Sequence, residues 1–147
     1  MYIKNALIGL LLFIPLLSFG QVKVDDVGDG WKAKVDSAIR LIKVTDAKKY
    51  NVLTQNCASV KFWIGKFSTT EDSSILISSF EATHGSINDI AACLVHESLH
   101  LHIKNKKVYM TAKDEEEFCY AYELDFLRKV PGCEQWLLDH ALDHSKD

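Results

Sequence analysis

The strongest constraint on the fold is the segment that begins at Ser86, because it predicts a helix apolar on nearly all sides. Ser86 and Asp89, three residues later, form a capping box, which is typical of a helix start. A helix that is apolar around most of its circumference is a buried one. The apolar residues of the segment are Ile87, Ile90, Ala91, Cys93, Leu94, Val95, Leu99 and Leu101. We therefore expect a central helix on which the rest of the domain packs.

The same segment carries the sequence His96-Glu97-Ser98-Leu99-His100, which has the form H-E-x-x-H. Residues four apart lie on one face of a helix, so both imidazoles can bind one ion. Glu97 lies about 100° around the helix from His96 and can act as general base on a water bound to that ion. Imidazoles suit zinc, and three protein ligands plus a water make a catalytic site. Chance occurrence is the alternative, but these polar side chains are costly to bury unless a metal satisfies them.

A third protein ligand must come from elsewhere in the chain. One known pattern continues with a glycine and a third histidine, but Ile103 and Lys106 occupy those positions. The other common solution is a carboxylate on the next helix. Thr111 and Asp114 form a second capping box, which predicts that such a helix follows.

Three consecutive glutamates, Glu115, Glu116 and Glu117, lie in the first turns of that second helix. Its inward stripe is predicted to consist of Tyr120, Ala121, Leu124 and Leu127. Glu117 falls on this stripe, Glu115 points away from it and Glu116 lies at its margin. We predict Glu117 as the third metal ligand, with Glu116 as the alternative. Acidic residues in a first turn also stabilise a helix without any metal.

The part of the chain before the motif predicts two helices and two strands. Apolar spacing indicates a helix from Trp31 to Ile42 and a short one from Asp46 to near Asn56. Alternation over Ala58–Phe67 predicts a strand, the polar residues 68–72 a turn, and Ser74–Phe80 a second strand antiparallel to the first. The H-E-x-x-H segment resembles that of zincins, and this resemblance implies that the second strand is a sheet edge beside the cleft, where an extended peptide could add by main-chain hydrogen bonds. An ordinary edge strand with no ligand is the alternative. The fold class is α+β, with a small antiparallel or mixed sheet.

Four further histidines have weaker claims to function. His84 is expected in a solvated loop, and His102 cannot share an ion with His100 because it lies about 200° around the helix. His140 and His144 are four apart on a last helix after Pro131-Gly132, but no carboxylate motif supports a second metal site there.

The N-terminal residues 1–20 have the features of a signal peptide. Lys4 precedes an apolar run from Ala6 to Leu17, and Ser18-Phe19-Gly20 is a small-x-small cleavage signal. We expect a mature domain over residues 21–147 that is secreted or periplasmic, with an uncleaved anchor as the alternative. An even number of cysteines in an exported chain suggests two disulfides among Cys57, Cys93, Cys119 and Cys133, although buried free thiols are the alternative.

The size and charge of the chain narrow the class of partner. A length of 147 residues suits one domain, and 48% hydrophobic and 25% charged residues are ordinary for a globular protein. The net charge is −3, so no basic excess suggests nucleic acid, and no basic amphipathic stretch suggests a membrane surface.

The motif followed by a glutamate on the next helix resembles the gluzincin class of zinc metallopeptidases. The stretches Ile90–Lys104 and Glu115–Leu127 are similar to small exported bacterial proteins with this core. The resemblance implies a minimal zincin-like domain in which His96, His100 and Glu117 hold Zn²⁺ and a water. It also implies that Glu97 takes a proton from this water and passes it to the leaving amine. A donor to the transition state is expected as well, for which Tyr109, Tyr120 and His84 are candidates.

The sequence thus predicts an exported peptidase that hydrolyses peptide bonds of a peptide or protein substrate with a zinc-bound water. The second hypothesis is a non-catalytic zinc-containing binding or structural domain with the same fold. A third is a dormant peptidase that needs a partner or processing.

Overall fold

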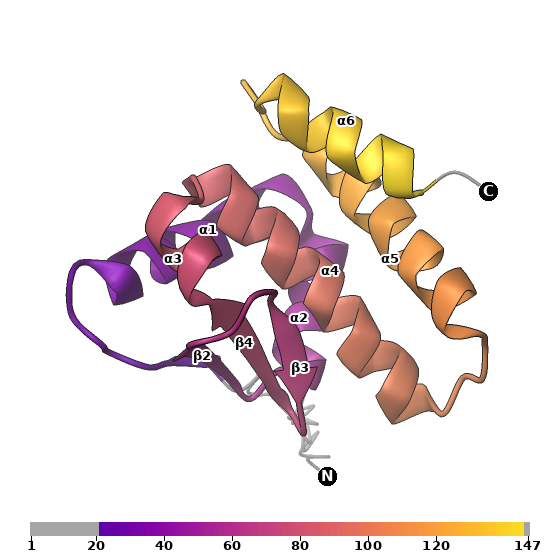
Figure 1. Cartoon of the computed structure of the whole chain (residues 1–147), viewed down its shortest axis with the longest axis horizontal. Coiled ribbons are helices and arrows are strands. Elements are labelled where there is room, and N and C mark those ends of the chain that lie inside the picture. Colours follow the sequence, from indigo (N-terminus) through magenta and orange to yellow (C-terminus); the bar gives the residue numbers. More distant parts are fainter. Residues whose placement is uncertain (1–20, 146–147) are drawn as a thin grey trace, which may run out of the picture.

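The computed structural model describes residues 21–145, and the predicted signal peptide lies outside them. The described residues form six helices and a four-stranded sheet, which confirms the α+β class. In chain order the elements are β1 (Lys23–Val24), α1 (Trp31–Thr45), α2 (Ala47–Asn56), β2 (Ser59–Trp63), β3 (Thr69–Glu71), β4 (Ser74–Ser78), α3 (Ser79–His84), α4 (Ile87–Lys106), α5 (Ala112–Leu127) and α6 (Gln135–His144). Figure 1 shows α4 running through the middle of the molecule, with the sheet on one side and α5 on the other.

The sheet has the strand order β1-β2-β4-β3, and its topology differs from the prediction. The two predicted strands pair in parallel, Val60 opposite Ile75, rather than antiparallel. The reason is that residues 69–71, expected in a turn, form the extra strand β3, which is antiparallel to β4. The chain therefore reverses twice between β2 and β4 and returns in the original direction. The edge strand beside α4 is β3, not β4.

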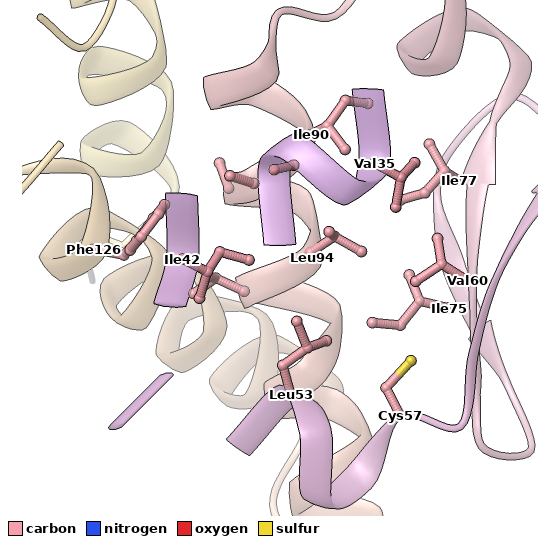
Figure 2. Close-up of a cluster of buried hydrophobic side chains, with 14 of the residues drawn as sticks. Val35, Ile42, Leu53, Cys57, Val60, Ile75, Ile77, Ile90, Leu94 and Phe126 are labelled. Carbon is pink, nitrogen blue, oxygen red and sulfur yellow. The ribbon is translucent and has the colours of Figure 1, made fainter. Parts of the chain in front are cut away.

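Helix α4 is the centre of the hydrophobic core, as its composition predicted. Ile90 and Leu94 of α4 lie among side chains from α1, α2, α5 and the sheet (Figure 2). The surrounding fully buried residues include Val35, Ile42, Leu53, Val60, Ile75, Ile77 and Phe126. Each such side chain stabilises the fold by about 1.5–3 kcal/mol through its burial. The core thus fixes α4 in position and in rotation.

Both predicted helix starts are capped by the expected hydroxyl side chain. The Ser86 hydroxyl accepts a hydrogen bond from the Asp89 backbone N–H at 3.1 Å, and Thr111 does the same for Asp114 at 3.1 Å. Helix α4 ends at Lys107, whose φ of 53° is left-handed, and the chain turns there toward α5. Helix α5 packs along α4, and α6 packs on α5 through the buried Leu137 and Ala141 (Figure 1).

The structure also bears on the expected disulfides and on membrane-spanning helices. All four cysteines are free thiols in the structure, so neither of the two expected disulfides is formed in it. Within residues 21–145, no helix is long and apolar enough to cross a membrane.

Candidate metal site

The two histidines of the motif converge at the middle of α4. His96 is 7% exposed, and its Nε2 lies 3.2 Å from Nε2 of His100. This placement follows from the helical spacing of four residues, which puts both rings on one face. Glu97 is buried beside them and lines the same cleft.

The glutamate that faces these histidines is Glu116. Its Oε2 lies 3.3 Å from Nε2 of His96, and its Oε1 lies 3.4 Å from Nε2 of His100. Glu117, predicted from the apolar stripe, instead pairs with Lys113 on its own helix at 3.1 Å. The reason is the position of Tyr120, whose ring packs on that of His96 with centroids 4.5 Å apart. Glu116 lies about 40° from Tyr120 around the helix and Glu117 about 60° from it on the other side, so only Glu116 is turned toward the histidines and the structure favours the alternative glutamate.

Two further carboxylates accept hydrogen bonds from Nδ1 of the two imidazoles, the nitrogens that face away from the proposed ion. Glu123 accepts a hydrogen bond from Nδ1 of His96 at 3.0 Å, and Glu115 accepts one from Nδ1 of His100 at 2.7 Å. An ionised carboxylate only accepts, so each Nδ1 carries a hydrogen, and it is Nε2 of each ring that would give up its proton to bind an ion. This is the usual arrangement around histidine ligands of zinc. The prediction that Glu115 points away was therefore wrong, and Glu123, seven residues after Glu116, was missed.

Negative charge is concentrated around the two rings. Burial raises the pKa of Glu97, against the lowering effect of His96 and His100. Burial alone would lower the pKa of His96, but hydrogen bonds to Glu116 and Glu123 outweigh it and raise the pKa to about 9. The hydrogen bond to His96 lowers the pKa of Glu116. Clustered carboxylates of this kind are favoured by a nearby cation.

The distances between the donor atoms fit a tetrahedral zinc ion. Two ligand atoms each about 2.05 Å from such an ion are about 3.3–3.4 Å apart. The distance of 3.2 Å between the imidazole nitrogens is close to this value. Each oxygen of Glu116 faces one of them, Oε2 at 3.3 Å from His96 and Oε1 at 3.4 Å from His100, so the carboxylate lies on the side where an ion would bind. The donor set therefore fits the metal that the motif predicts.

Cys119 groups with the two histidines as a possible metal ligand, a role that the sequence analysis does not assign to it. Its Sγ and a ring nitrogen of each of His96 and His100 all lie within 4.8 Å of one another. Cys119 is three residues after Glu116 and so faces α4 from the next turn of α5. Its spacing of three residues from Glu116 is the sequence signal that could have indicated this role.

A cleft of about 670 Å³ gives access to the site. One wall is Ser68, Thr69 and Thr70 at the edge strand, and the opposite wall includes Glu115 and Glu116 of α5. A second cavity of about 460 Å³ adjoins Glu97 and is lined on one side by residues of α6. Both cavities reach Tyr120. The metal site would therefore be open to a substrate.

The other histidines and Tyr109 lie farther from the candidate metal site. His84 stacks on Phe80 and Tyr109 is 92% exposed, and neither lines the two cavities. His102 contacts Asn56 through Nδ1 at 3.3 Å, on the side of α2. His140 and His144 stack with ring centroids 4.3 Å apart and line the second cavity.

Comparisons of the chain with family models, with curated proteins and with solved structures found no match. The function must therefore be inferred from the geometry and chemistry of the site.

Proposed function

We propose that this chain is an exported zinc-dependent peptidase with a minimal zincin-like domain. In it His96, His100 and Glu116 hold the ion, and Glu97 is the general base. The observation that carries the proposal is the set of donor distances, 3.2, 3.3 and 3.4 Å, beside the buried Glu97 in an open cleft. Export rests on the predicted signal peptide.

Each residue of the site has a task that its surroundings support. A bound zinc ion would polarise a peptide carbonyl and lower the pKa of a water molecule. Glu97 accepts the proton from that water and donates it to the leaving amine; its raised pKa suits a group that must do both. Glu115 and Glu123 hold the imidazoles in the orientation that directs Nε2 at the ion.

The substrate is an extended peptide that lies along β3. This strand is one edge of the sheet, and Thr69 and Thr70 line the cleft. A peptide added to such an edge would gain main-chain hydrogen bonds and pass in front of Glu97. Of the three candidates, Tyr120 is the best placed donor to the transition state, because it lines both cavities and its ring lies beside that of His96.

A non-catalytic zinc domain is the second candidate. The observation in its favour is Cys119, because four protein ligands would close the coordination of zinc, as in structural sites. The two candidates differ in the role of Glu97, which lines the cleft but is not needed to hold the metal.

The first experiment measures zinc by mass spectrometry in residues 21–147 and in the matched variants Glu116→Ala and Glu117→Ala. We expect about one zinc per chain, lost in the first variant and kept in the second. If zinc were lost only in Glu117→Ala, the third ligand would be Glu117, as the apolar periodicity predicted. No zinc in the unsubstituted chain, even after zinc is supplied, would refute the metal site.

The second experiment tests catalysis with a peptide library and the variant Glu97→Gln. Under the peptidase proposal, the variant keeps zinc and folded structure but loses cleavage by at least about 100-fold, since it lacks the general base. A protein that binds zinc and cleaves no peptide, with or without Glu97, would support the non-catalytic candidate.

A further inference from the structure

Cys119 is the one cysteine that the structure groups with the motif histidines. Its side chain is 0% exposed and packs against Leu99 and Ile103 of α4. Its Sγ lies within 4.8 Å of a ring nitrogen of both His96 and His100. The three side chains form a group that could hold a metal ion.

We propose that the Cys119 thiolate is the fourth protein ligand of the ion, so that the resting site is closed by His96, His100, Glu116 and Cys119. This inference rests on the metal site proposed above and concerns the regulation of that site. The unusual consequence is that water, which hydrolysis needs, must displace a protein ligand before the reaction can begin.

The distances support sulfur ligation with little movement. With zinc about 2.3 Å from sulfur and about 2.05 Å from nitrogen, a tetrahedral site places the two atoms about 3.5–3.6 Å apart. The observed limit of 4.8 Å exceeds this by little more than 1 Å, which a small rotation of a cysteine side chain can supply. Thiolate is also the ligand in many structural zinc sites.

Glu116 and Cys119, the two proposed anionic ligands, differ in their exposure to solvent. The side chain of Glu116 is 55% exposed at the cleft, whereas Cys119 is enclosed between α4 and α5. Cys119 therefore reaches the ion from the protein interior, and Glu116 reaches it from the solvent side. Such a set holds the ion on both sides and leaves no position for water.

Opening of the site is a ligand exchange that involves no redox step. The bond from sulfur to the ion would break, and water would take the vacated position. The thiolate would take a proton from solvent and become a neutral thiol, so the positive charge of the site would rise by one and the bound water would keep both of its protons for transfer to Glu97. A substrate that binds along the cleft and moves α5 relative to α4 would favour this exchange.

The test replaces zinc with Co²⁺ in the chain from residue 21 and records its absorption. Co²⁺ in a tetrahedral protein site gives visible d–d bands, and a thiolate ligand adds a sulfur-to-cobalt charge-transfer band in the near ultraviolet. We expect both features in the unsubstituted protein. Cys119→Ser should keep the visible bands and lose the charge-transfer band, whereas the control Cys93→Ser, at a cysteine that lines the second cavity, should keep both.

The possible outcomes separate this inference from the proposed function. Visible bands without a charge-transfer band in the unsubstituted protein would support the metal site and overturn sulfur ligation. The absence of both would overturn the metal site and, with it, this inference. Retention of the charge-transfer band in Cys119→Ser would assign the sulfur to another cysteine and overturn the proposal.

A second measurement needs no variant, in case Cys119→Ser does not fold. Alkylation of each cysteine by iodoacetamide is followed by mass spectrometry in the presence of zinc and after chelation. We expect zinc to slow the modification of Cys119 and to leave that of Cys57, on the far side of the core, unchanged. Equal rates at Cys119 with and without zinc would overturn the proposal.

Discussion

The substitution Glu123→Gln should weaken zinc binding although Glu123 does not face the ion. Glu123 is buried and accepts the hydrogen bond from Nδ1 of His96 at 3.0 Å. The glutamine keeps the size of the side chain but removes the charge that fixes the imidazole tautomer and raises the basicity of Nε2. Loss of such a partner usually lowers metal affinity about 10–100-fold.

This loss of zinc affinity can be expressed as a loss of the stability that zinc binding adds to the folded protein. At free zinc about 1,000 times the dissociation constant of the unsubstituted protein, binding stabilises the fold by about 4.1 kcal/mol. A 10–100-fold weaker site at the same zinc concentration gives only about 1.4–2.7 kcal/mol. Since 1 kcal/mol moves the melting temperature of a domain of this size by roughly 4 °C, the zinc-induced shift should fall by roughly 6–11 °C.

The assay is thermal unfolding with and without zinc, together with competition against a chelating dye. The matched control is Glu117→Gln, which makes the same chemical change on the same helix at a residue that pairs with the exposed Lys113. We expect the control to bind zinc as the unsubstituted protein does. Affinity of Glu123→Gln within twofold of the unsubstituted protein would refute the assigned role of Glu123.

Two further predictions concern the fold. Phe126 is the largest fully buried side chain, so Phe126→Ala should lower the free energy of unfolding by about 3–5 kcal/mol in urea titrations, and a loss below about 1 kcal/mol would contradict this packing. Hydrogen bonds from Lys129 and Lys49 lower the pKa of Asp125 to about 2, so its contribution is present above pH about 4 and lost as the pH falls toward 2. Asp125 is 56% exposed, so Asp125→Asn should cost less than about 1 kcal/mol at neutral pH, with no difference near pH 2.

The parts of the structure that were predictable are those that depend on local sequence. The capping boxes at Ser86 and Thr111 fixed the starts of α4 and α5, and the apolar circumference of α4 predicted its burial. The approach of His96 to His100 required only a helix. Each of these features is decided within about one or two helical turns, where spacing alone determines which side chains meet.

The choice between Glu116 and Glu117 depended on contacts that local spacing does not contain. Neighbouring residues on a helix differ by about 100°, so a modest rotation of α5 about its axis changes which glutamate faces α4. That rotation is fixed by Tyr120 on His96, by Phe126 in the core and by Glu123 on Nδ1 of His96. The ligand set is thus a property of the packed pair of helices.

The direction of β4 was unpredictable for a similar reason. Residues 68–72 are polar, which suits a turn as well as it suits a short edge strand. Pairing of Thr70 with Ile75 makes the segment a strand, and this pairing reverses the direction of the chain once more than the sequence suggested.

The position of α6, which packs on α5, has a consequence for how the protein opens. The last two helices form a hairpin that joins the remainder largely through α4, and the candidate metal ligands lie across that junction (Figure 1). An ion bound by residues of both α4 and α5 would link the hairpin to α4 and oppose its separation from the rest of the domain. Amide hydrogens of α5 and α6 should then exchange with solvent more slowly when zinc is bound, whereas those of the sheet, on the other side of α4, should exchange at the same rate.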